Sequence, residues 1–339
     1  MSSAPLPKAT LYYFGGSVWA SVPLLCAEEK GFGPDVLEKR SVDLLNGDNF
    51  SPAYLTSKLT RSHWREPSLG GVRSHQTDSQ TLLTIVPVNP RGSVPTLVAP
   101  YEHTTTPDLP TKYKALTDSI EICQFLDSST SRSTTFQSPS LTPATVQGSS
   151  ESKFWVEHVH GPEAADPNAF LMSFRSDDER KAKNSNLPGD FLRGRQKALE
   201  KYAKEAGGDD ARLAAFYKNK IKENGGLLAM YEGKIDASPF IEASKGMYVA
   251  LNKTIALLEK SLRAAYLVGD QVSLADLHLG AYLARILAAL GAKSITDVDG
   301  ALEKLDAALT EASGPKFKAY VKVLFERESF QKVYAEGLH

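Results

Sequence analysis

This chain of 339 residues lacks long apolar runs, has only two cysteines and carries no surplus of either charge. No run approaches the roughly 18 apolar residues that a membrane span requires. The opening "MSSAPLPKAT" lacks both the charged region and the apolar region of a signal peptide. The formal net charge of -1 gives no reason to expect a nucleic acid or an anionic membrane as partner. We therefore expect a cytoplasmic protein that binds neither.

The cysteines, Cys26 and Cys123, each lie within an apolar helical pattern. This indicates two buried thiols in a reducing compartment, and neither a disulfide framework nor a thiolate metal site. His158 and His160 are two residues apart, so on a helix they point to different faces and lack the four-residue spacing of a helical metal pair. We expect no metal and no cofactor.

The remaining composition is that of a globular protein, and the chain is long enough for about two domains. Near the N-terminus, "ATLYYF" reads as a strand, "VWASVPLLCAEEKGF" as a helix and "KRSVDLL" as a second strand, which together form a βαβ unit. Further on, "SVPTLVAP" and "TKYKAL" read as paired strands and "TDSIEICQFLD" as a helix. After a stretch rich in Ser, Thr and Pro, all patterns have helical spacing.

These patterns divide the chain into two domains and a linker. The α/β domain covers residues 1–128 and the linker 129–150, and an all-α domain covers 151–339. Polar stretches at about 46–79 and 175–208 read as insertions.

Pro95, in the stretch "NPRGSVPTLV", stands inside an apparent strand. Proline cannot donate to a sheet ladder, and it forces the preceding Val94 towards extended geometry. Either this is an edge strand, or the backbone before Pro95 faces something other than a strand.

Four stretches in order resemble the cytosolic glutathione transferase superfamily, and a Ser-type, fungal class within it. They are "LYYFGGSVWASVPLLCAEEKG", "NPRGSVPTLV", "LTDSIEICQFL" and "YLVGDQVSLADLHLGAYLARIL". The resemblance covers both domains but neither insertion. It implies an α/β plus all-α fold, in which a thioredoxin-like βαβ-ββα domain precedes an all-helical one.

The resemblance also implies a glutathione site around Pro95. A cis Val94–Pro95 bond would let the Val94 backbone pair with the peptide as a strand would, and Ser93 would contact the glycine end with Arg91 close by. A plain turn and a solvated arginine are the alternatives. For the γ-glutamyl end, the resemblance assigns the carboxylate to Ser119 and the ammonium to Asp118, where simple helix capping is the alternative.

Ser17 stands at the start of the first helix, at the position of the family's catalytic serine. Its hydroxyl and the helix N-terminus would favour a thiolate over a thiol. Plain capping is the alternative role. Tyr12 and Tyr13 are rivals at the end of the strand, while Ser21 should point along the helix.

The resemblance places an apolar electrophile against the helical domain, with Trp19, Trp155 and His158 as candidates for the wall of its site. Trp19 packing on the linker is equally compatible with the sequence. Ser273 and Asp276 form a capping box, which is a structural feature.

The function implied is a detoxifying glutathione transferase, in which an activated glutathione thiolate attacks an apolar electrophile. The alternatives are a glutathione- or hydrophobic-ligand-binding protein with little turnover, and a structural member without a peptide site. The family also implies a homodimer. We expect the insertion at 46–79 to be an anchored lid whose middle, around 68–80, is mobile.

Overall fold

The computed structural model describes residues 8–55, 89, 91–100, 113–129 and 139–339, so the middle of the expected lid lies outside the described residues. The first domain is built on a four-stranded sheet in the order β2-β1-β3-β4. Its strands are β1 (Ala9–Tyr13), β2 (Leu37–Ser41), β3 (Thr96–Pro100) and β4 (Tyr113–Leu116). β1 runs parallel to β2 and antiparallel to β3, and β3 runs antiparallel to β4.

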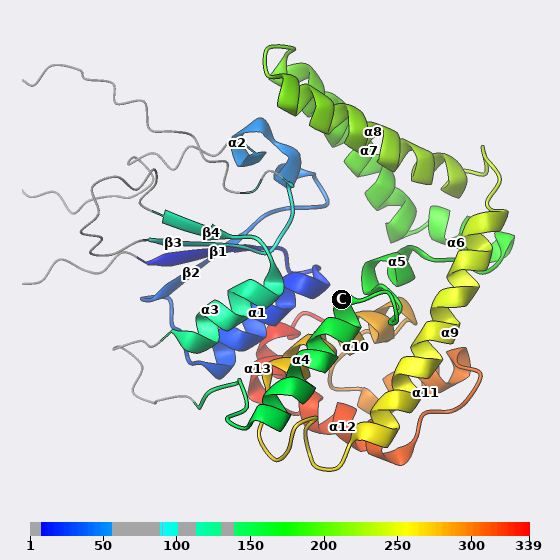
Figure 1. Ribbon diagram of the computed structural model, residues 1–339. Helices are drawn as coiled ribbons and strands as arrows, with labels where there is room; N and C mark the ends of the chain where they lie inside the picture. Colours follow the sequence, from blue (N-terminus) through cyan, green and yellow to red (C-terminus); the bar gives the residue numbers. More distant parts are fainter. Residues whose placement is uncertain (1–7, 56–88, 90, 101–112, 130–138) are drawn as a thin grey trace, which may run out of the picture.

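Two helices, α1 (Val18–Glu29) and α3 (Ser119–Ser128), cover one face of this sheet (Figure 1). The first is buried along most of its length, so it is apolar nearly all round and lies inside the molecule. β1, α1 and β2 form the expected βαβ unit, and β3, β4 and α3 the expected ββα unit. The thioredoxin-like first domain is confirmed.

The second strand begins earlier than the sequence pattern suggests. β2 covers Leu37–Ser41 and ends before the apolar residues of "KRSVDLL". Asp43 causes this ending, because its Oδ1 accepts hydrogen bonds from the backbone N–H groups of Leu45 and Asn46, at 2.8 and 3.0 Å, and so closes a turn.

All the named elements from Val146 onward are helices, as expected, and the first of them begins inside the segment that we assigned to the linker. The helices are α4 (Val146–His160), α5 (Pro167–Met172), α6 (Asp177–Asn184), α7 (Leu187–Ala206), α8 (Ala211–Tyr231), α9 (Ser238–Ser261), α10 (Leu274–Ala289), α11 (Val298–Ala308), α12 (Pro315–Phe325) and α13 (Glu328–Val333).

Helix α10 is the centre of the helical domain and also its contact with the first domain. Residues Leu274 to Leu287 are buried, and α1, α4 and α5 pack around the helix (Figure 1). The expected capping box starts it, with Asp276 accepting from the backbone N–H of Ser273 at 2.8 Å. Because α1 and α10 share one apolar cluster, the two domains have a common core.

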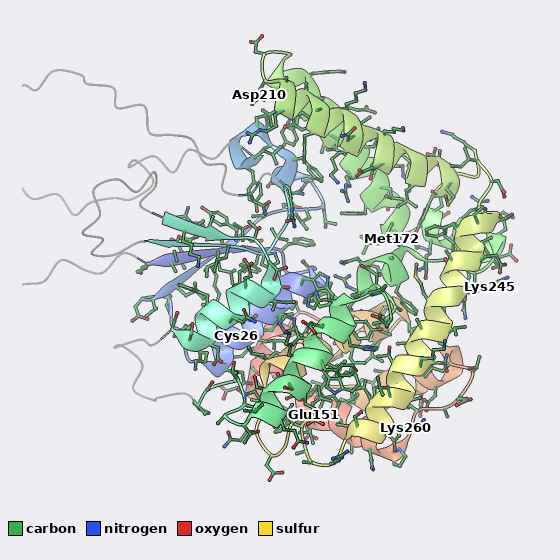
Figure 2. The ribbon with its side chains drawn as sticks, viewed as in Figure 1. Cys26, Glu151, Met172, Asp210, Lys245 and Lys260 are labelled. Carbon is green, nitrogen blue, oxygen red and sulfur yellow. The ribbon has the colours of Figure 1, made fainter. Side chains whose placement is uncertain are left out.

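Helices α7 and α8 form a long hairpin that stands away from this core (Figure 1). Its tip carries Asp210, which caps α8, and Met172 lies near its base (Figure 2). The charged insertion predicted at 175–208 corresponds to α6 and α7, so it is one arm of this hairpin and not a loop.

The hairpin rests on the first residues of the other insertion. There, η1 (Asp48–Phe50) and α2 (Pro52–Leu55) bury Phe50 and Leu55 against Leu199, Leu213 and Tyr217. The Tyr217 hydroxyl also donates to the Phe50 carbonyl at 2.7 Å. The two insertions therefore pack on each other, which the sequence pattern did not indicate.

Candidate functional site

Strand register brings three of the predicted site segments to one end of the sheet. Tyr12, near the end of β1, pairs with Thr96 at the start of β3, and Leu97 pairs with Leu116 at the end of β4. The turn before α1, the segment before β3 and the start of α3 must therefore be neighbours. This end of the sheet faces the helical domain (Figure 1).

Ser17 is the N-cap residue of α1 by position, but its side chain makes no capping hydrogen bond. Its backbone N–H donates to the Phe14 carbonyl at 3.0 Å, which closes the turn and sets the start of the helix. The hydroxyl thus stands half-buried beside the unsatisfied N–H groups of the first turn. Ser21, one turn on, donates its hydroxyl back to the Ser17 carbonyl and so lies along the helix.

The Val94–Pro95 peptide bond is cis, as expected. The ladder of β3 starts at Thr96, so the Val94 backbone lies just outside it. Ser93 and Val94 are half-buried, whereas Arg91 is exposed on the turn.

Three residues that the sequence analysis missed hold this segment in place. The Asn89 side chain donates to the Ser93 carbonyl at 2.6 Å and to the Thr96 hydroxyl at 2.8 Å. Asn49 donates to the Gly92 carbonyl at 2.6 Å, and the Tyr54 hydroxyl donates to the Ser93 carbonyl at 3.0 Å. Asn49 and Tyr54 belong to η1 and α2, so the start of the insertion supports the segment before β3.

The start of α3 combines a cap with a buried hydroxyl. Asp118 Oδ1 accepts from the N–H groups of Ile120 and Glu121, at 2.9 and 3.1 Å. The capping role considered for Asp118 is therefore present, and it leaves Oδ2 without a hydrogen-bond partner among the described residues. Ser119 follows at the first helical position and is 5% exposed.

A cluster of one tryptophan and two histidines joins α1 to helices α4 and α10 of the helical domain. The Trp19 ring stacks on His160 at a centroid distance of 3.8 Å, and His160 Nε2 lies 2.9 Å from His278 Nδ1. Burial lowers the pKa of His160 and brings that of the fully buried His278 well below its ordinary value. Both rings are therefore neutral near pH 7. The sequence analysis considered His160 only as a metal ligand.

The other two wall candidates are less available than Trp19. Trp155 is only 2% exposed and packs in the main core. His158 is half-buried, with Nε2 3.1 Å from the Thr254 hydroxyl, and burial lowers its pKa.

A pocket of about 430 Å³ opens between the end of α4, the loop to α5, and α9. None of Trp19, Trp155 and His158 lines it, whereas His160 does. Its lining is formed mainly by small residues: His160, Gly161, Pro162, Ala164, Ala165, Asp166, Ala243, Gly246, Met247 and Ala250.

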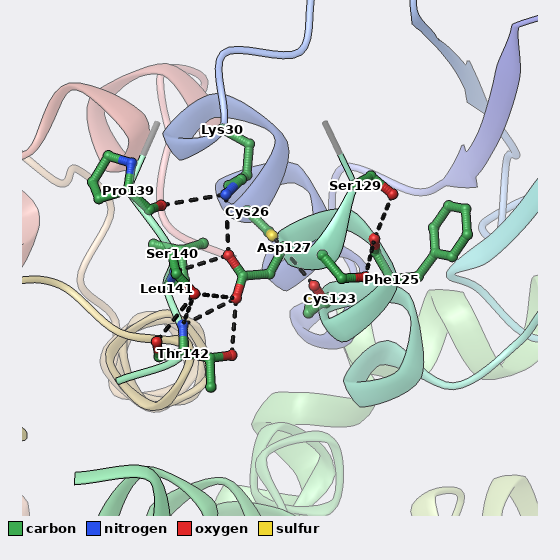
Figure 3. Close-up of polar contacts among 11 residues, drawn as sticks. Cys26, Lys30, Cys123, Phe125, Asp127, Ser129, Pro139, Ser140, Leu141 and Thr142 are labelled. Atoms are coloured by element: carbon green, nitrogen blue, oxygen red, sulfur yellow. Dashed lines mark hydrogen bonds and ion pairs between the residues drawn. The ribbon is translucent and has the colours of Figure 1, made fainter. Parts of the chain in front are cut away.

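The two cysteines take no part in this site. Both are free and buried, and Cys26 Sγ lies 3.7 Å from the Cys123 carbonyl oxygen (Figure 3). Burial raises the pKa of the Cys123 thiol well above its ordinary value, so this thiol is unreactive. Among the described residues, no three His, Cys, Asp or Glu side chains gather so that they could hold a metal ion. Within the same part of the chain, no helix is long and apolar enough to cross a membrane.

Comparison with known proteins identifies the fold through solved structures. No protein-family model matches the chain, and no curated protein matches it. The structure is similar to that of the beta-etherase LigF from Sphingobium sp. strain SYK-6, with a TM-score of 0.53, 16% identity, and coverage of 97% of this chain and 99% of that one. It is also similar to glutathione transferase Omega 2C from Trametes versicolor, with a TM-score of 0.51, 18% identity, and coverage of 98% and 94%. Both similarities span the two domains, and they confirm the predicted fold.

Proposed function

We propose that this chain, which has the fold of the cytosolic glutathione transferases, binds glutathione and activates its thiol. The observation that carries the proposal is the meeting of three segments at one end of the sheet. They supply a hydroxyl at Ser17 that makes no capping hydrogen bond, a backbone outside the ladder at Val94, and a helix start at Ser119. A donor for sulfur, a strand-like edge and a carboxylate site are the groups that a short acidic peptide with a thiol requires.

Glutathione would lie across these segments as an extended peptide. Its cysteinyl backbone would pair with the N–H and C=O of Val94 beside Pro95. The γ-glutamyl carboxylate would meet the N-terminus of α3 and the Ser119 hydroxyl, and Asp118 Oδ2 would face the ammonium. Ser93 and the exposed Arg91 would serve the glycine end.

Ser17 would donate its hydroxyl to the glutathione sulfur. A donated hydrogen bond and the positive end of the α1 dipole both favour the charged form of that sulfur, so the thiol would lose its proton to water more readily. The thiolate would then attack an electrophilic carbon, form a carbon–sulfur bond and displace the leaving group.

An apolar electrophile would approach from the helical domain. Trp19 is the best placed of the three wall candidates, because its ring is half-buried and borders the first turn of α1. His158 would contribute from α4 with Trp155 packed behind it, and His160, on which Trp19 stacks, extends this wall towards the pocket.

We also propose that the protein acts in the cytoplasm, in detoxification, and as a homodimer. Two buried free cysteines suit a reducing compartment. Large exposed apolar side chains include Val146 and Phe154 on α4 and Val249 on α9, and a homodimer would be able to cover them.

A conjugation assay run alongside retention on glutathione resin tests the proposal. We expect the chain to bind the resin and to convert an apolar aryl halide in the presence of glutathione. Retention without conversion would leave a glutathione-binding protein with little turnover, and the absence of both would reject the proposed function.

A further inference from the structure

Arg285 is a buried cation placed against the turn that precedes α1. It belongs to α10 and is only 5% exposed. Its Nη2 donates to the Gly16 carbonyl at 2.6 Å, one residue before Ser17. Its Nε is buried and has no hydrogen-bond partner among the described residues.

No carboxylate of the described residues forms an ion pair with Arg285. A buried charge without a counter-charge is costly, so such groups are ordinarily paired. The other end of α1 follows that rule, since Arg327 forms two hydrogen bonds with the Glu29 carboxylate, at 2.8 and 2.6 Å. Within the described part of the chain, one arginine beside α1 is therefore paired with a carboxylate and the other is not.

The side chains of His339 and Tyr334, which interact with the charge of Arg285, are neutral near pH 7. His339 lies next to Ser21, with Nε2 3.1 Å from the Ser21 hydroxyl. Burial, together with the charge of Arg285, lowers the pKa of His339 to about 4, so the ring is neutral. Burial also raises the pKa of Tyr334, which keeps that phenol protonated.

At the neighbouring elements, His160 on α4 and Asp118 at the start of α3 are titratable groups. The neutral His160 ring stacks on Trp19 in the first turn of α1. Asp118 is exposed, and its Oδ1 accepts the two hydrogen bonds of the α3 cap. Neither group neutralises Arg285.

We propose that Arg285 is the fixed cation of an anion site at the N-terminus of α1, and that the anion is the glutathione thiolate. This inference rests on the proposed function. Through its bond to Gly16, Arg285 positions the turn that presents Ser17, and its charge adds to the dipole of α1. On binding, the thiol proton goes to solvent water, so no oxidant or further reactant is needed.

Three variants separate charge from hydrogen bonding. Arg285→Gln keeps a donor for the Gly16 carbonyl but removes the charge, Arg285→Lys keeps the charge, and Arg285→Met removes both. Arg195→Gln is the matched control, because Arg195 on α7 also has a buried Nε with no partner in the described part of the chain, but packs over Phe50. Thermal unfolding of each variant shows that it is folded.

The first readout is the pKa of the glutathione thiol in the complex. It is measured from the ultraviolet absorbance of the thiolate as a function of pH. We expect Arg285→Gln and Arg285→Met to raise this pKa by about one pH unit. Arg285→Lys and Arg195→Gln should leave it near the wild-type value. A purely structural role for Arg285 would change stability without this dependence on charge.

The second readout is the binding of two glutathione analogues whose charge at sulfur does not depend on pH. Glutathione sulfonate is anionic at sulfur, and S-methylglutathione is neutral there. Arg285→Gln should weaken binding of the sulfonate roughly tenfold and leave binding of the S-methyl peptide unchanged. If both bind to Arg285→Gln as to wild type and the thiol pKa does not move, the role of Arg285 is rejected while glutathione binding stands. If wild type binds neither peptide nor glutathione, the proposed function falls and this inference with it.

Discussion

At the scale of single residues, the state of the Ser17 hydroxyl decides what the α1 turn can do. A serine at this position ordinarily caps its helix by accepting from an N–H two or three residues on. Here the backbone of Ser17 makes the turn while the hydroxyl makes no capping bond. A serine hydroxyl has one O–H donor besides its acceptor lone pairs, so the Ser17 hydroxyl can donate to a ligand at the start of the helix.

We expect Ser17→Ala to lower turnover with glutathione by about ten- to a hundredfold, because a hydrogen bond to a charged group contributes about 1.5–3 kcal/mol. The kinetic pKa of the glutathione thiol should rise, whereas retention on glutathione resin should change little. Ser21→Ala, one turn along the same helix, is the control. An unchanged pH–rate profile in Ser17→Ala would remove Ser17 from the mechanism.

The candidate site residues that the sequence predicted lie in local patterns. A proline within a strand pattern points to Val94 and Pro95, and the family resemblance points to Ser17 and Asp118 at the starts of apolar helices. The role of Asn89 could have been predicted from the sequence, because asparagine side chains commonly form hydrogen bonds with the backbone of turns such as "NPRG". Arg285 acts across the domains, so its contact with Gly16 could not be read from spacing. The available signal was a lone arginine within the apolar "LADLHLGAYLARILAA".

At the scale of elements, Asp127 fastens the ends of two helices to the linker (Figure 3). The carboxylate lies at the C-terminal end of α3 and pairs with Lys30, the C-cap of α1, at 3.2 Å. It also accepts from the N–H groups of Leu141 and Thr142, at 2.8 and 3.0 Å. Burial alone would raise the pKa of Asp127, but these hydrogen bonds and Lys30 lower it.

We expect Asp127→Ala to reduce the free energy of unfolding by about 3 kcal/mol, because it leaves Lys30 buried without its partner. Asp299→Ala is the matched control, since that carboxylate is 77% exposed in its ion pair with Lys322 and should contribute about 0–1 kcal/mol. Denaturant titration measures both. A loss of similar size in the two variants would contradict this account of Asp127.

The contribution of Asp127 should also depend on pH. Because its pKa is lower in the folded than in the unfolded chain, the stabilisation is fully present above the unfolded pKa and is lost as the pH falls through the folded pKa. The stabilities of wild type and Asp127→Asn should therefore converge in acid. A difference that persists unchanged in strong acid would show that the charge of Asp127 is not the cause.

At the scale of the whole molecule, the α7–α8 hairpin has its own small core and supports the segment before β3 indirectly. Phe50, Leu55, Leu199, Leu213 and Tyr217 form a cluster separate from the main core. η1 and α2, which form one side of it, also supply Asn49 and Tyr54 to the segment before β3. The sequence showed both insertions as polar stretches, and their contact depends on residues more than a hundred positions apart.

We expect Tyr217→Ala to loosen the hairpin without unfolding the main core, because it removes a buried ring and the hydroxyl bonded to the Phe50 carbonyl. Hydrogen exchange should accelerate in α7, α8 and η1 and stay slow in α10. Tyr217→Phe, which loses only the hydroxyl, should show a smaller effect in the same elements. Equal acceleration in α10 would mean that the hairpin and the main core unfold together.

Calorimetric titration of the full chain with glutathione and with cysteinylglycine tests the central claim most directly. The account predicts that glutathione binds, and that loss of the γ-glutamyl group weakens binding at least tenfold because the start of α3 is then unused. Ser119→Ala should weaken the binding of glutathione by a similar factor and leave the binding of cysteinylglycine unchanged. Absence of glutathione binding, or equal affinity for the two peptides, would contradict the site described at this end of the sheet.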